Sequence, residues 1–253
     1  MIIDQFRLDG KVAIVTGCAA GLGQGIARGL AEAGAEIAGV DYVESAETQS
    51  MIQTLGRSFL AIRADLSTLT PIPALLQQVL EAFGKIDILV NNAGIVRRAD
   101  AIEFSEADWD GVMNLNLKSL FFLSQAVAKR FIAQGTGGKI INIASMLSYQ
   151  GGIRVPSYTA SKSGVMGVTR AMANEWARHG INVNAIAPGY MATNNTAPLR
   201  ADAARSAEIL GRIPANRWGT PADLQGVAVF LASQAADYVQ GFTIAVDGGW
   251  LAR

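Results

Sequence analysis

Tyr158 and Lys162 are the two side chains in this sequence whose types and spacing point most directly to chemistry. They are four residues apart in a stretch with helical periodicity, so the phenol and the ammonium share one helix face. A free tyrosine has a pKa of about 10, and a neighbouring ammonium favours the phenolate form. The spacing therefore predicts an acid/base pair, although the same spacing also occurs on solvent-exposed helices.

Ser145 and Asn116 are two further polar residues placed where they can assist this pair. Ser145 follows the apolar run 140–144, so its hydroxyl is expected at the carboxyl end of a strand, within reach of a substrate oxygen. Asn116 interrupts an apolar helical stretch, which suits binding a water molecule or kinking the helix. A capping or solvent-facing role is the alternative for Asn116.

The segment 16–23 is a glycine-rich turn between a predicted strand and a predicted helix. Its residues Gly17, Gly21, Leu22 and Gly23 are expected to present backbone N–H groups at a helix N-terminus, where a pyrophosphate binds. The spacing Gly-x-x-x-Gly-x-Gly departs from the commoner Gly-x-Gly-x-x-Gly pattern. Its position after a strand and before a helix still predicts a dinucleotide site.

Asp41, at the end of the second predicted strand, is expected to bind the adenosine ribose hydroxyls and to repel a 2′-phosphate. Arg28 is the only basic residue between 17 and 42, and it lies inside a predicted helix. These observations favour NAD over NADP. The alternative is that Asp41 merely begins a turn. The other cofactor contacts expected at strand ends are Tyr42, Asp65, Leu66, Asn92, Ala93 and Gly94.

Short apolar runs alternate with helical patterns along the whole chain, which predicts an α/β fold with a doubly wound parallel sheet. We expect a Rossmann-type three-layer arrangement in a single domain spanning 1–253, with residues 189–216 as an irregular lid or connector. The expected strands are 12–16, 37–41, 59–64, 86–90, 139–144, 182–187 and 243–246, and the expected helices are 22–33, 46–55, 72–83, 108–133, 157–178 and 221–232.

Composition excludes several classes of function. Lys plus Arg and Asp plus Glu both total 21, and no cluster of charge attracts nucleic acid or a membrane surface. One cysteine and one histidine exclude a disulfide and predict no metal site, which together with the lack of a signal peptide favours the cytoplasm. The uncharged stretch 180–199 contains four Asn, two Pro and two Gly, so it does not read as a membrane span.

Six motifs in order resemble those of the short-chain dehydrogenase/reductase family: the glycine turn, Asn91-Asn-Ala-Gly94, Asn116, Ser145, Tyr158-x-x-x-Lys162 and Pro188-Gly189. The resemblance implies seven strands, hydride and proton transfer, and commonly a homotetramer. It implies that Tyr158 exchanges the proton, Ser145 polarises the substrate oxygen, Lys162 binds the nicotinamide ribose and Asn116 supports a water. Pro188, Gly189, Met191 and Thr193 are expected at the nicotinamide.

Segments 92–98, 145–158 and 246–253 are similar to those of family members that interconvert 2-keto-3-deoxygluconate and 2,5-diketo-3-deoxygluconate in pectin breakdown. Arg97 or Arg154 could then bind the substrate carboxylate and Gln150 a hydroxyl, unless the arginines face solvent or pair with Asp100 or Glu103. Gluconate 5-dehydrogenase, an NADPH-linked 3-oxoacyl-carrier reductase and a non-catalytic dinucleotide-binding regulator are the alternative functions.

Overall fold

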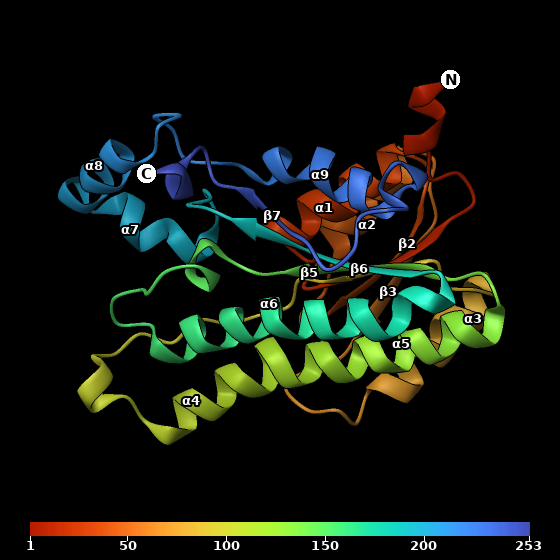
Figure 1. Cartoon of the computed structure of the whole chain (residues 1–253), viewed down its shortest axis with the longest axis horizontal. Helices are drawn as coiled ribbons and strands as arrows, with labels where there is room; N and C mark the ends of the chain where they lie inside the picture. Colours follow the sequence, from red (N-terminus) through yellow and green to blue (C-terminus); the bar gives the residue numbers. More distant parts are fainter.

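A seven-stranded parallel sheet runs through the computed structural model, which describes all 253 residues (Figure 1). The strand order is β3-β2-β1-β4-β5-β6-β7, as in a doubly wound sheet. The order reverses between β1 and β4, so their carboxyl ends border a crevice. The strands are β1 (Val12–Thr16), β2 (Glu36–Asp41), β3 (Phe59–Arg63), β4 (Ile88–Asn91), β5 (Gly138–Ile143), β6 (Ile181–Pro188) and β7 (Thr243–Val246).

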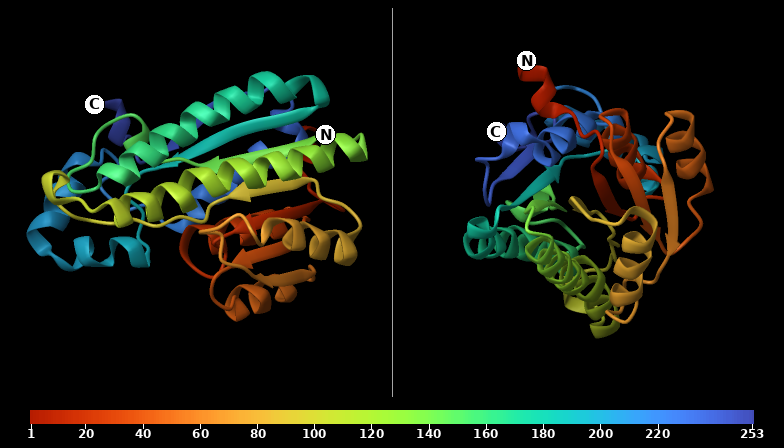
Figure 2. Two further views of the ribbon diagram at one scale, coloured as in Figure 1. Left: turned by 90° about the horizontal axis from the view of Figure 1, so that it is seen from below. Right: turned by 90° about the vertical axis from the view of Figure 1, so that its right-hand side faces the viewer.

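Helices cover both faces of the sheet (Figures 1 and 2). Leu123 and Phe131 belong to a buried cluster on one face, and Ile26 and Leu231 belong to a second cluster on the other. The central strands are therefore buried on both sides, which explains their continuously apolar sequences. One face carries α1 (Gly21–Glu32), α2 (Ala46–Thr54) and α9 (Gln225–Ala232), and the other carries α3 (Ile72–Phe83), α4 (Glu106–Met113), α5 (Leu120–Gln134) and α6 (Pro156–Trp176). No helix is long and apolar enough to cross a membrane.

The sequence predicted all seven strands, and their ends differ from prediction by at most two residues. The helix expected at 108–133 consists instead of α4, a π-helix at Asn114–Ser119 and α5. The expectation of irregular structure at 189–216 is wrong, because two helices form there: α7 (Ala197–Ala201) and α8 (Ala203–Arg212). Asp202 caps α8 by accepting the Arg205 N–H at 3.0 Å, and buried Ile209 packs in a cluster with Trp250.

A chain of buried polar side chains joins the two strands that lead into the site. The amide of Asn91 on β4 donates to Ser124 Oγ (2.8 Å) on α5 and to Asn142 Oδ1 (2.9 Å) on β5. The amide of Asn142 donates in turn to Thr169 Oγ1 (2.9 Å) on α6. All four side chains are buried, so these bonds fix the two helices against the strand ends.

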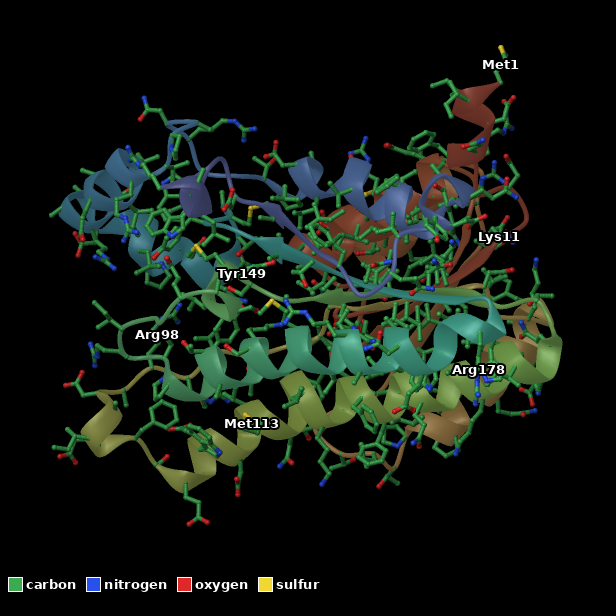
Figure 3. All side chains as sticks on the ribbon, in the orientation of Figure 1. Met1, Lys11, Arg98, Met113, Tyr149 and Arg178 are labelled. Carbon is green, nitrogen blue, oxygen red and sulfur yellow. The ribbon has the colours of Figure 1, made fainter.

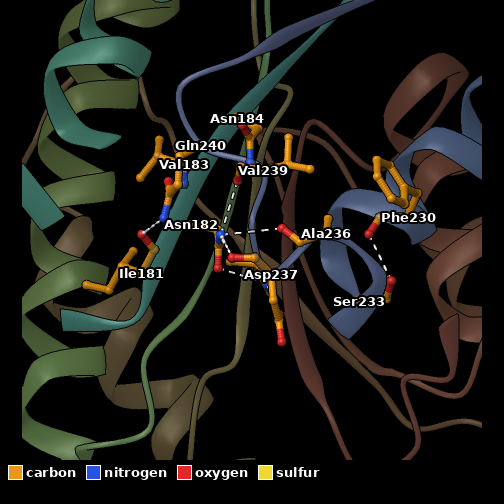
Figure 4. Close-up of polar contacts among 11 residues, drawn as sticks. Ile181, Asn182, Val183, Asn184, Phe230, Ser233, Ala236, Asp237, Val239 and Gln240 are labelled. Carbon is orange, nitrogen blue, oxygen red and sulfur yellow. Dashed lines mark hydrogen bonds and ion pairs between the residues drawn. The ribbon is translucent and has the colours of Figure 1, made fainter. Parts of the chain in front are cut away.

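The segment before the edge strand β7 is held by asparagine side chains of β6 (Figure 4). The Asn182 amide donates to the carbonyls of Asp237 (2.8 Å) and Val239 (3.1 Å). Asn184 donates to the Val239 carbonyl (2.8 Å) and accepts the Phe242 N–H (3.0 Å). Polar side chains thus satisfy backbone groups that the short strand β7 leaves without a ladder partner.

Replacing Asn142 with alanine should lower the free energy of unfolding by roughly 2–4 kcal/mol, because it opens a cavity and leaves an Asn91 N–H without its partner. Urea unfolding at a fixed protein concentration measures the change. The matched control is Gln53→Ala on an exposed part of α2, which should change stability by less than about 0.5 kcal/mol. Equal stability of the two variants would contradict the role given to this network.

Candidate active site

A cleft of about 840 Å³ lies at the carboxyl ends of the strands. It has the size of a site for a small molecule or cofactor. Two of the four predicted catalytic residues, Tyr158 and Lys162, line it. The predicted cofactor residues that also line it are Gly17, Gly21, Leu22, Asp41, Tyr42, Asp65, Leu66, Asn92, Ala93, Gly94 and Thr193.

The glycine turn at one wall of the cleft needs its glycines for two reasons. Gly17 and Gly21 have φ values of 67° and 60°, which side-chain-bearing residues rarely adopt. A Cβ on Gly23 would lie 2.1 Å from the Gly17 carbonyl oxygen, so this position supports the turn from behind. Helix α1 begins at Gly21 without a side-chain cap, which leaves its first N–H groups available to an anion. The turn therefore fits the pyrophosphate of a dinucleotide.

Asp41 joins the end of β2 to this turn. Its carboxylate accepts the Ala19 N–H at 2.8 Å and the Val43 N–H at 3.2 Å. Arg63 lies opposite Asp41 in the register of β2 and β3, and its Nε donates to the Tyr42 carbonyl at 3.1 Å. The sequence argument that no cation lies near Asp41 is therefore wrong. It considered neighbours along the chain, whereas the pairing of β2 with β3 would have revealed Arg63.

The predicted acid/base pair lies on α6 with both side chains directed to the end of β5. Lys162 is 4% exposed, its Nζ donates to the Ile143 carbonyl at 2.5 Å, and it lies 5.6 Å from the centroid of the Tyr158 ring. Ser145 lies two residues past the end of β5, and its Oγ accepts the Leu147 N–H at 3.1 Å. Tyr158 and Lys162 of α6 thus meet the end of β5 in the wall of the cleft, and Ser145 lies next to them.

Burial dominates the titration of this pair. It lowers the pKa of the Lys162 ammonium to about 8. Burial also raises the pKa of the Tyr158 phenol, while a hydrogen bond with Ser145 and the charge of Arg98 lower it. The expectation that the neighbouring ammonium lowers the Tyr158 pKa is wrong in its net direction, because desolvation of the phenolate outweighs the favourable contacts.

Asn116 lies in the π-helix, which agrees with the predicted distortion of the long helix. Its side chain accepts the Ile95 N–H (2.9 Å) and donates to the Ile95 carbonyl (3.0 Å) and to Ser161 Oγ (3.3 Å). It is 1% exposed. Asn116 therefore fixes the loop after β4, which forms a wall of the cleft, against α6.

Three predicted nicotinamide contacts lie behind the cleft instead of lining it. Pro188 ends β6, and Gly189 follows where a Cβ would lie 2.6 Å from Asp247 Cα. The Met191 side chain is 4% exposed, and its carbonyl accepts the Thr196 hydroxyl at 2.6 Å. These residues shape the segment that carries Thr193 into the cleft.

The predicted substrate residues lie outside the cleft. Arg97 Nε is 3.3 Å from Asp108 Oδ1, and Arg154 Nε is 2.9 Å from Asp100 Oδ1. The sequence left open whether these arginines pair with acids, and the structure places both in such pairs. Gln150 likewise lies outside the cleft.

Arg98 is a candidate that the sequence reasoning missed. Its Nη2 donates to the Asn195 carbonyl at 3.3 Å, and Asn195 lines the cleft. Arg97 and Arg98 both follow β4, and the sequence alone does not show which of them pairs with an acid.

Comparisons with known proteins agree with this geometry. The family described as enoyl-(acyl carrier protein) reductase matches residues 17–251. The chain is 72% identical to the 2-dehydro-3-deoxy-D-gluconate 5-dehydrogenase of Escherichia coli (strain K12), over the full length of both chains. A crystal structure from Agrobacterium tumefaciens with bound NADP is 58% identical and superposes with a TM-score of 0.93, covering 98% of this chain and 99% of that one.

A second solved structure is that of a gluconate 5-dehydrogenase from Burkholderia cenocepacia J2315 in complex with NADP and tartrate. It is 42% identical, covers all of both chains and has a TM-score of 0.95. These similarities confirm the Rossmann-type fold and the predicted nicotinamide dinucleotide chemistry on CH–OH groups. The chain belongs to the short-chain dehydrogenase/reductase family.

Proposed function

We propose that this protein interconverts 2-keto-3-deoxygluconate and 2,5-diketo-3-deoxygluconate, and also oxidises 2-deoxygluconate at carbon 3, in the breakdown of pectin-type uronates. The observation that carries the proposal is the placement of Tyr158 and Lys162 side by side in the wall of the cleft, with Ser145 close enough to the phenol to lower its pKa. The 72% identity to a 2-dehydro-3-deoxy-D-gluconate 5-dehydrogenase supports the choice of substrate.

In this proposal Tyr158 takes the proton of the carbon-5 hydroxyl during oxidation and returns it during reduction. Ser145 hydrogen-bonds the same oxygen and keeps it beside the phenol. The dinucleotide, when bound, supplies the hydride acceptor for oxidation and the hydride donor for reduction. Lys162 binds the nicotinamide ribose, while the hydrogen bond with Ser145 and the charge of Arg98 favour the phenolate of Tyr158. Asn116, held by Ile95, supports a water that carries the proton toward solvent.

Residues behind and beside the cleft complete the proposed cofactor site. Pro188, Gly189 and Met191 position the chain, and Thr193 contacts the nicotinamide carboxamide. Asp41 supports NAD as the preferred cofactor, because its carboxylate disfavours a 2′-phosphate. Arg63 lies beside it and offers a cation for that phosphate, so NADP should bind with a smaller penalty than Asp41 alone would impose.

Oxidation of gluconate at carbon 5 is the second candidate activity, supported by the similarity to a gluconate 5-dehydrogenase. Both substrates are sugar acids with a reacting hydroxyl at carbon 5. We also propose a homotetramer, by family resemblance, and a reducing cytoplasmic setting, in which the buried free thiol of Cys18 stays reduced.

The substrate assignment predicts a higher kcat/KM for NAD-dependent oxidation of 2-keto-3-deoxygluconate than of gluconate. Tyr158→Phe should lower this kcat/KM by roughly 100-fold or more, because it removes the acid/base group. Steady-state rates at matched cofactor concentration give both numbers. A preference for gluconate would move the protein to the second activity, and full activity of Tyr158→Phe would contradict the mechanism.

The cofactor assignment predicts that wild-type protein prefers NAD, with two variants moving the preference in opposite directions. Asp41→Asn should lower the ratio of kcat/KM for NAD to that for NADP by roughly 10-fold, because it removes a repulsive charge. Arg63→Gln should raise the same ratio, because it removes the cation beside the ribose. If Arg63→Gln leaves the ratio unchanged, Arg63 has no part in cofactor choice.

A further inference from the structure

Three arginines lie near the mouth of the cleft, and they differ in whether their charge is neutralised. Arg97 pairs with Asp108, and Arg154 pairs with Asp100. Arg98 forms no ion pair, and its side chain donates one hydrogen bond, from Nη2 to the Asn195 carbonyl (3.3 Å). A guanidinium has five N–H donors, so most of those on Arg98 are available to a ligand.

Arg98 joins the loop after β4 to the segment that contains Asn195. It lies in the loop after β4, three and two residues past the lining residues Ile95 and Val96. Its partner Asn195 lies with Asn194 in the opposite wall. Figure 3 places Arg98 at the end of the molecule that also holds Tyr149, far from Arg178. The unpaired cation is therefore at the entrance to the site.

The same cation lies close enough to the reacting group to influence it, since its charge lowers the pKa of the Tyr158 phenol. In a sugar acid that reacts at carbon 5, the carboxylate is carbon 1. A guanidinium that binds this carboxylate must therefore lie a few carbon–carbon bonds from Tyr158, and it binds best when no acid already neutralises it. None of the three arginines lines the cleft itself, but Arg98 is unpaired and is bonded to the lining residue Asn195, whereas Arg97 and Arg154 are paired with acids.

We infer that Arg98 binds the carboxylate of the sugar-acid substrate and so sets both the preference for acids and the position of the reacting carbon at Tyr158. This inference rests on the proposed function. A guanidinium binds a carboxylate through two parallel hydrogen bonds, which fixes orientation as well as supplying affinity. The bond to Asn195 holds the guanidinium beside the cleft before the substrate enters.

Arg200 is the competing cation. Its Nη2 donates to the Thr193 carbonyl at 3.0 Å, from α7 on the far side of the same wall. Arg200, like Arg98, does not itself line the cleft, but only the charge of Arg98 is among the influences on the Tyr158 pKa. The test therefore compares the two arginines directly.

The experiment measures kcat/KM for 2-keto-3-deoxygluconate and for its neutral carbon-1 amide, and the binding of tartrate to NADH-loaded protein by calorimetry. Arg98→Gln should raise KM for the acid and Kd for tartrate by roughly 10- to 100-fold, as expected for loss of hydrogen bonds to a charged group. Its kcat/KM for the amide should stay near the wild-type value. Arg98→Lys should give KM and Kd values between those of wild-type protein and Arg98→Gln, because lysine keeps the positive charge but lacks the two parallel N–H donors of a guanidinium.

Arg178→Gln, which removes a cation at the opposite end of the molecule, is the matched control and should change none of these values. The inference would be overturned if Arg98→Gln lowered kcat/KM equally for the acid and the amide. It would also be overturned if Arg200→Gln weakened binding of the acid and Arg98→Gln did not. Tartrate binding tests the role of Arg98 without requiring turnover of the proposed substrate. If wild-type protein does not oxidise 2-keto-3-deoxygluconate, the proposed function fails, while the tartrate series still reports on Arg98.

Discussion

The buried ammonium of Lys162 is the interaction that the rest of this site must accommodate. Removing an ammonium from water is costly unless hydrogen bonds replace its hydration, and here the Ile143 carbonyl provides one at 2.5 Å. That bond places α6 against the last residue of β5. It also places Tyr158, one helical turn earlier, at the carboxyl edge of the sheet, where the family binds its dinucleotide.

Other buried hydrogen bonds around this one hold β5 and α6 in a fixed relative position. Asn142 on β5 is bonded to Thr169 on α6 and to Asn91 on β4, so the sheet and helix are joined by polar bonds beneath the site. Asn116 does the same for the loop after β4. Loops thus line the cleft, and hydrogen bonds from buried side chains hold these loops against strand ends and helices.

Much of this arrangement was predictable because it depends on local pattern. The apolar runs predicted the strands, and the four-residue spacing of Tyr158 and Lys162 predicted that both side chains lie on the same face of a helix. Helix α8 was missed because its stability comes from packing Ile209 against Trp250, which is distant in the sequence. Arg63 and Arg98 were missed for a related reason: strand register and ion pairing decide which cations are free near a ligand, and neither is local.

The direct test of the account is the pH dependence of unfolding for wild-type protein and Lys162→Met at one protein concentration. The Lys162 pKa is about 8 in the folded protein against an ordinary value of 10.5, so between these pH values the unfolded chain binds the extra proton. Wild-type stability should therefore rise relative to Lys162→Met, by roughly 3 kcal/mol in total, as pH increases from 7 to 10.5. A difference that stays constant over this range would contradict the buried, desolvated lysine on which the site is built.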